Sequence, residues 1–77
     1  GYYVSDLNAI RNVTPAGVVT TVAGIPGVTG DIDGIRGVGL LRDPRSIVFD
    51  PAAQTLFIAD GTRIRTMAPD GTLRTLV

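Results

Sequence analysis

Residues 56–77 read LFIADGTRIRTMAPDGTLRTLV, and residues 2–23 read YYVSDLNAIRNVTPAGVVTTVA. A shift of 54 residues aligns the two stretches without a gap. Apolar positions then match apolar positions, and turn residues match turn residues. The identical pairs are Asp6/Asp60, Ile10/Ile64, Arg11/Arg65, Pro15/Pro69, Gly17/Gly71 and Thr21/Thr75. The chain therefore contains an internal repeat, which any prediction of its fold has to explain.

Each copy of the repeat has the pattern of three short strands. Their β-branched and apolar runs are ended by Asp or by a Pro-x-Gly turn, both of which are typical of strand connections. We expect strands at 2–6, 9–14 and 18–23, and again at 55–60, 63–68 and 72–77. The second copy has a further strand at 45–50, RSIVFD. Its counterpart in the first copy would lie before Gly1.

Four strands in sequence, joined by short turns, make an antiparallel meander. A meander repeated at a fixed period is typical of the blades of a β-propeller. We therefore predict an all-β fold with a partial blade at 1–24, an inter-blade crossing loop at 25–44 and a complete blade at 45–77. A single seven-stranded sandwich or barrel is the alternative, and it accounts for the strands but not for the period.

The composition agrees with strands and turns and excludes several classes of site. The 77 residues include ten Gly and five Pro, seven acidic residues that are all Asp, and seven basic residues that are all Arg. Cys and His are absent, which excludes disulfides, thiolate metal sites and a His-activated nucleophile. The net charge is zero and no basic cluster is present, so we expect no nucleic-acid binding. No apolar run approaches the roughly 20 residues that cross a bilayer, so no membrane insertion is expected.

The second copy, with the loop before it, resembles an NHL repeat. The pattern includes a Gly-rich D-G loop, an apolar pair, a D-P-x-x-I-x-x-D strand, an L-F-I-A-D strand, an I-R pair and a P-D-G turn. In this chain these are Asp33-Gly34, Leu40-Leu41, Asp43-Pro44, Ile47, Asp50, Leu56 to Asp60, Ile64-Arg65 and Pro69-Asp70-Gly71. The first copy carries the matching Tyr3-Val4-Ser5-Asp6, Asn8-Ala9-Ile10-Arg11 and Pro15-Ala16-Gly17.

The resemblance implies a non-enzymatic scaffold or binding module of the NHL propeller type. Such propellers bind proteins or RNA, form parts of receptors and adhesins, or act as lyase domains, and the family resemblance favours an extracellular or periplasmic location. NHL propellers usually have about six blades, whereas this chain has fewer than two. We therefore expect completion by other copies of the chain or by further blades of a longer chain, with a protein ligand possible. A ring of copies alone would lack every second inner strand, which favours a longer chain.

Two alternatives stay open at this point. The chain could be a fragment of a metal-dependent hydrolase or lyase whose catalytic residues lie on other blades, since some propeller enzymes hold a central metal with acids from strand ends. It could also be a designed or excised repeat. We expect no catalytic, cofactor-binding or metal-binding residue within these 77 residues.

The crossing loop, residues 25–44, invites two site hypotheses that its residues support poorly. Its glycines do not form G-x-G-x-x-G, and no Lys follows as a phosphate-binding loop requires. Asp31-x-Asp33-Gly34 is similar to the start of a calcium loop, but the third acid and the closing Glu are missing. We expect this loop to carry the chain from the outer strand of one blade to the inner strand of the next.

The remaining candidate residues have structural roles in this prediction. Asp6, Asp50 and Asp60 end strands and are expected to accept hydrogen bonds from turn amides. Arg11 and Arg65 are expected to pair with Asp residues of their own or a neighbouring blade. The apolar residues expected at the interface between blades are Tyr2, Tyr3, Val4, Leu40, Leu41, Leu56, Phe57 and Ile58.

Overall fold

The computed structural model describes all residues from 1 to 77 and contains seven β-strands and no helix. The observed strands begin and end within two residues of the predicted ones. They are β1 (Tyr2–Asp6), β2 (Ala9–Val13), β3 (Val19–Gly24), β4 (Pro44–Asp50), β5 (Thr55–Asp60), β6 (Arg63–Met67) and β7 (Leu73–Thr75).

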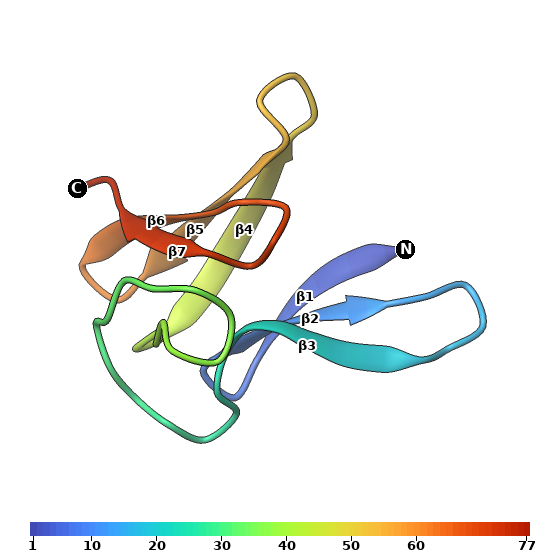
Figure 1. Ribbon diagram of the computed structural model, residues 1–77, viewed down its shortest axis with the longest axis horizontal. Helices are drawn as coiled ribbons and strands as arrows, with labels where there is room; N and C mark the ends of the chain where they lie inside the picture. Colours follow the sequence, from blue (N-terminus) through green and yellow to red (C-terminus); the bar gives the residue numbers. More distant parts are fainter.

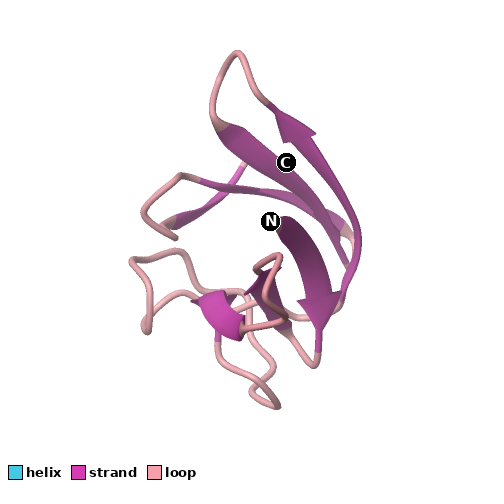
Figure 2. Ribbon diagram, turned by 90° about the vertical axis from the view of Figure 1, so that its right-hand side faces the viewer, coloured by secondary structure: helices cyan, strands magenta, loops and turns pink.

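The strands form two antiparallel sheets (Figure 1). The N-terminal sheet has the order β1-β2-β3, and the C-terminal sheet has the order β4-β5-β6-β7. Consecutive strands are neighbours throughout, so each sheet is a meander. The predicted all-β fold of antiparallel meanders is confirmed. Figure 2 shows that the two sheets are separate and curved, with all connections between strands made by loops.

The turns explain two features of the sequence. Gly17 and Gly71, the last residues of the two Pro-x-Gly turns, have φ angles of 85° and 90°. Only Gly adopts such angles without a steric cost, which accounts for its repetition at this position. The β1–β2 turn places Leu7 and Asn8 at positive φ as well, which is the backbone of a tight hairpin.

The two sheets pack with unlike faces together. We define the front face of each sheet by equivalent residues of the repeat: Leu56 and Ile58 in the C-terminal sheet, and Tyr2 and Val4 in the N-terminal sheet. The back face is the opposite side, which carries Ile64 in the C-terminal sheet and Ile10 in the N-terminal sheet. The back of the N-terminal sheet packs on the front of the C-terminal sheet, where Tyr3 contacts Phe49 with ring centroids 6.0 Å apart. The buried residues of this core are Ile10, Ala23, Leu41, Leu56, Ile58, Met67 and Leu73.

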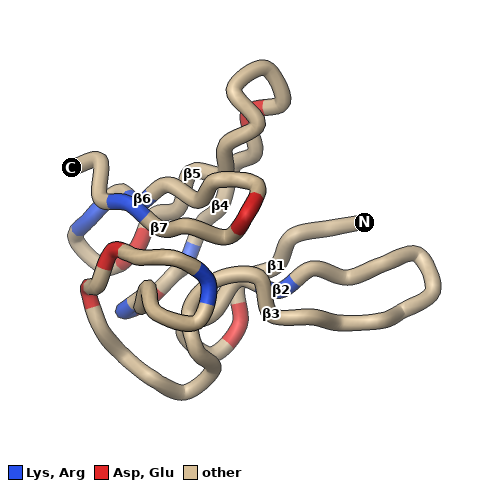
Figure 3. The backbone as a smooth tube through the Cα atoms, viewed as in Figure 1, with Lys and Arg blue, Asp and Glu red and all other residues tan.

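The crossing loop folds back over the C-terminal sheet rather than running free. Gly34 and Leu73 exchange two backbone hydrogen bonds, of 3.0 and 2.8 Å, which attach the loop to β7. Figure 3 shows that the charged residues gather where this loop meets the C-terminal sheet, whereas the hairpin of β2 and β3 carries few charges. No helix in this structure is long and apolar enough to pass through a membrane.

Candidate functional site

A buried ion pair joins the end of β5 to the middle of β6. Asp60 is the last residue of β5, and Arg65 lies on β6 with its side chain on the front face beside Ile58. Arg65 Nη1 is 3.1 Å from Asp60 Oδ2, and neither side chain is exposed to solvent. A buried ion pair is tolerated only when further hydrogen bonds satisfy both partners.

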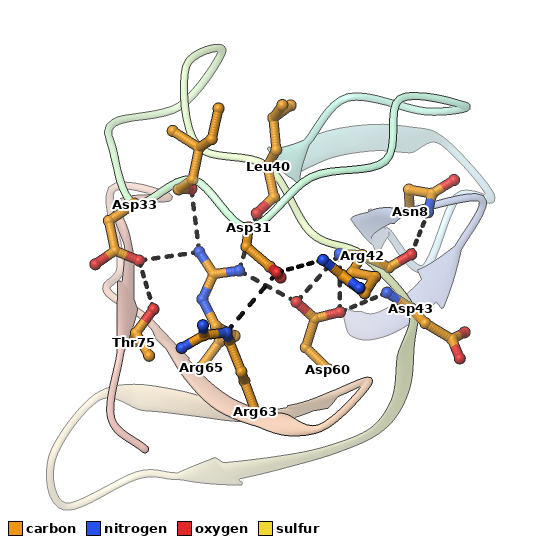
Figure 4. Close-up of polar contacts among 11 residues, drawn as sticks. Asn8, Asp31, Asp33, Leu40, Arg42, Asp43, Asp60, Arg63, Arg65 and Thr75 are labelled. Carbon is orange, nitrogen blue, oxygen red and sulfur yellow. Dashed lines mark hydrogen bonds and ion pairs between the residues drawn. The ribbon is translucent and has the colours of Figure 1, made fainter.

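Arg65 obtains those hydrogen bonds from the crossing loop (Figure 4). Its Nη1 donates to the carbonyl oxygen of Leu40 at 2.9 Å. Its Nη2 donates to the carbonyl oxygen of Ile32 and to Asp33 Oδ1, each at 3.1 Å. The planar guanidinium therefore fixes two separated parts of the loop at once, which an ammonium group would not do.

Asp60 holds the end of the same loop. Its carboxylate accepts hydrogen bonds from the backbone amides of Arg42, at 2.9 and 3.1 Å, and of Asp43, at 2.6 Å. Asn8 adds a link to the other sheet, because its Nδ2 donates to the carbonyl oxygen of Arg42 at 2.6 Å. The crossing loop is thus clamped between the two sheets by side chains that end strands or occupy turns.

Two carboxylates of the loop complete the clamp. The Thr75 hydroxyl donates to Asp33 Oδ1 at 2.8 Å, and this bond, helped by the charge of Arg65, holds the pKa of Asp33 below its ordinary value of 3.8. Asp31 Oδ2 lies 2.8 Å from Arg42 Nη2 and 3.8 Å from Arg63 Nε. Both acids of the Asp31-x-Asp33-Gly34 motif therefore face arginines, and no group of three or more His, Cys, Asp or Glu side chains suited to a metal ion is present.

The corresponding residues of the N-terminal sheet form a much less complete arrangement. Arg11 Nη1 lies 3.5 Å from Asp6 Oδ2, but 53% of the Asp6 side chain and 23% of the Arg11 side chain are exposed. The Nε atoms of Arg11 and Arg65 are both buried without a hydrogen-bond partner, so the two pairs differ in the bonds of their aspartates and of the Nη atoms. No loop covers Asp6 and Arg11, so this pair is partly exposed to solvent. In the second repeat, Asp60 and Arg65 bind residues 31–43 instead.

The same difference extends over the front faces of the two sheets. Leu56 and Ile58 are 2% and 0% exposed, whereas their counterparts Tyr2 and Val4 are 74% and 39% exposed. The back faces differ in the opposite sense. Ile10 is fully buried against the C-terminal sheet, whereas its counterpart Ile64 is 38% exposed. The molecule therefore has an open front at one end and an open back at the other.

A groove borders the open front. It has a volume of about 350 Å³ and lies between the start of β1 and the front of the C-terminal sheet. Its lining is mostly apolar and consists of Gly1, Tyr2, Tyr3, Ile47, Phe49 and Leu56. β1 is an edge strand, so its outer backbone groups have no partner strand.

The structure places the predicted interface residues in different environments. Leu41, Leu56 and Ile58 belong to the core between the sheets, and Tyr3 packs against it. Tyr2 and Val4 lie on the open front, Leu40 is half-buried within the crossing loop, and Phe57 is half-buried on the back of the C-terminal sheet.

The predicted turn acids also differ from one another. Asp50 accepts hydrogen bonds from the amides of Ala52 and Ala53 in its own turn, at 3.0 and 3.4 Å. Asp60 accepts instead from the crossing loop, and Asp6 forms only its ion pair with Arg11. The contributions of Asp33, Arg42, Thr75 and Asn8 were not identified from the sequence. The available signals were the places of Asp33 and Asn8 in the NHL-like pattern and the identity of Thr21 and Thr75 in the repeat.

Comparison with known proteins supports the fold but identifies no family. No protein-family model matches the chain, and no curated protein matches it. Among solved structures, the chain is similar to an auxiliary nutrient binding protein from Bacteroides thetaiotaomicron, with a TM-score of 0.74 and 21% sequence identity. The match covers 95% of this chain but 22% of that protein, so the chain spans about a fifth of its length. At this identity the similarity shows the fold alone, and the NHL assignment stays a prediction.

Proposed function

We propose that this chain is an NHL-type β-propeller module whose function is association, as a scaffold or binding unit without enzymatic activity. It associates through its two open faces with other copies of itself or with further blades of the same kind. The similar solved structure is described as that of a nutrient binding protein, which favours a binding role over a catalytic one.

The observation that carries this proposal is the opposite exposure of equivalent residues. Ile10 is buried because a second sheet covers the back of the first, and Ile64 is 38% exposed because nothing covers the back of the second. Since the two sheets are repeats, the open back of one copy matches the open front of another. Such a head-to-tail contact uses two different surfaces and closes into a ring when the rotation permits.

The exposed apolar area supports the same conclusion. Large apolar side chains are exposed on both open faces, among them Tyr2 at 74%, Val48 at 67% and Val77 at 76%. Contiguous apolar surface on a small domain is typical of a contact with another protein. Small domains also gain stability when association extends their core.

Native mass spectrometry at several protein concentrations tests this proposal. We expect one discrete oligomer, close to three copies for a six-bladed ring, whose population rises with concentration. A monomer at every concentration, or a continuous series of aggregates, would contradict association through matched faces.

A further inference from the structure

We propose that Asp6, Arg11 and the outer edge of β1 form a receptor for one loop-and-strand segment of the type of residues 31–50. The occupant is a segment of a further repeat, joined ahead of Gly1 in a longer chain. This inference rests on the proposed association of blades and specifies which segment completes the first sheet.

The second repeat shows what such a receptor holds. Asp60 and Arg65 bind residues 31–43 through two backbone amides, two carbonyl oxygens and one carboxylate. The chain then continues as β4, which pairs along the edge of β5 with Ile47 opposite Ile58 and Phe49 opposite Leu56. One continuous segment therefore supplies both the cover of the ion pair and the inner strand.

The first repeat has the receptor without the occupant. Arg11 and Asp6 correspond to Arg65 and Asp60, and Arg11 lies opposite Val4 on the front face as Arg65 lies opposite Ile58. Asp60 and Arg65 form hydrogen bonds with the crossing loop, whereas Asp6 is half-exposed and contacts only Arg11, at 3.5 Å, so the first ion pair has fewer partners than its counterpart. The unpaired edge of β1 and the apolar groove beside Tyr2 lie where an inner strand would pack.

Copies of the chain cannot supply the occupant. Each copy has two receptors but only one segment of this type, and residues 31–50 already occupy the receptor of their own C-terminal sheet. A second copy that donated its segment would open its own receptor. The occupant therefore comes from another repeat, and because residues 51–54 join β4 to β5, it would end next to Gly1.

The chemistry of the occupant follows from the contacts of residues 31–50. The segment carries an acid that reaches the guanidinium of Arg11, two adjacent free amides that reach Asp6, and a strand whose alternate residues are apolar. These features distinguish it from a strand that adds to an edge through backbone hydrogen bonds alone.

The test joins a second copy of residues 31–54 directly ahead of Gly1, which reproduces the spacing of the second repeat. Hydrogen exchange of the β1 amides is then compared with that of the 77-residue chain. We expect at least about tenfold slower exchange in the joined chain, because the added strand and the covered ion pair protect β1. In the joined chain, Arg11→Ala should make the β1 amides exchange about tenfold faster. The substitution leaves the acid and the carbonyl oxygens of the added segment buried without the guanidinium that binds them.

Arg74→Ala is the matched control, because Arg74 is exposed on β7 and lies outside the receptor. Asp6→Asn is a second receptor variant, for the case that Arg11→Ala does not fold. Exchange of β1 at the rate of the 77-residue chain, or equal protection in the receptor variants and in Arg74→Ala, would overturn the proposal. The mass of the 77-residue oligomer, measured separately, shows whether association itself has failed.

Discussion

Asp60 and Arg65 form an ion pair of 3.1 Å that is fully removed from solvent, and both side chains bind the loop that joins the two sheets. The equivalent pair, Asp6 and Arg11, lies at 3.5 Å and is open to solvent. The repeat therefore places the same two residues in two environments within one chain. Substitutions at equivalent positions of the two repeats should therefore have different effects on stability and association.

Asp60→Asn should destabilise the protein strongly. The substitution removes the charge opposite Arg65 and weakens the hydrogen bonds from the amides of Arg42 and Asp43. Breaking a buried ion pair by removing one partner costs about 3–5 kcal/mol. Urea unfolding followed by circular dichroism measures this loss, and Asp6→Asn, at the exposed equivalent site, should cost no more than about 1 kcal/mol. Equal losses in the two variants would contradict the assigned role of Asp60.

Gly71→Ala should be more harmful than Gly17→Ala. Both glycines have positive φ, so both substitutions cost about 1–2 kcal/mol of backbone strain. A Cβ at Gly71 would also collide with the carbonyl oxygen of Val22 across the sheet interface, whereas a Cβ at Gly17 meets no atom within 4 Å. Overpacking adds about 1–3 kcal/mol. Thermal unfolding of the two variants checks this order, and an equal loss of stability would show that the contact with Val22 is unimportant.

The stability of the protein should decrease in acid partly through Asp33. The pKa of this carboxyl is lowered in the folded state, chiefly by the hydrogen bond from the Thr75 hydroxyl. The stability it contributes is therefore fully present above its ordinary pKa of 3.8 and is lost as the pH falls through the lower folded value.

Thr75→Val removes that hydrogen bond and should make the free energy of unfolding less dependent on pH below 3.8. Urea unfolding at a series of pH values from about 2.5 to 5 measures this dependence. Thr66→Val, on the neighbouring strand β6, is the control and should keep the dependence of the unsubstituted protein. A Thr75→Val profile that coincides with the control would refute the role of the hydroxyl.

Ile64→Arg should prevent association without unfolding the protein. Ile64 is 38% exposed on the open back, so a charge there is solvated in the monomer but would be buried at a head-to-tail contact. Ile35→Arg is the control, because Ile35 is 64% exposed on the crossing loop. Sedimentation velocity should show a smaller species for Ile64→Arg alone. If both variants keep the same size as the unsubstituted protein, the back of the C-terminal sheet is not a contact surface.

The sequence predicted the strands because their signals are local. The Asp and Pro-x-Gly residues that end strands act on their own neighbours, and the repeat showed which turns correspond. The clamp on the crossing loop was not predictable in this way. Asp33 and Thr75 are 42 residues apart and meet only because Gly34 pairs with Leu73. The sequence predicted an Asp partner for Arg65 but not its carbonyl partners, because backbone carbonyls carry no sequence signal.

The exposure of equivalent residues was also beyond sequence analysis. Ile10 and Ile64 are identical and aligned, yet one is buried and the other is 38% exposed. The difference depends on which sheet has a neighbour, and the pattern of a single strand contains no information about that neighbour.

The central claim is that the open front of one copy meets the open back of another in the way the two sheets meet within the chain. Inside the chain, Gly71 lies against Val22. The repeat shift of 54 residues assigns the same contact to Gly17 of one copy and Leu76 of the next. The chain has no Cys, so the variants Gly17→Cys and Leu76→Cys each carry a single thiol.

The most direct measurement mixes the two cysteine variants and treats the mixture with a short bismaleimide cross-linker. We predict that the mixture gives a cross-linked dimer in clearly greater yield than either variant alone, because the head-to-tail contact pairs unlike positions. No dimer in the mixture, or equal yields from the mixture and the separate variants, would contradict the proposed association.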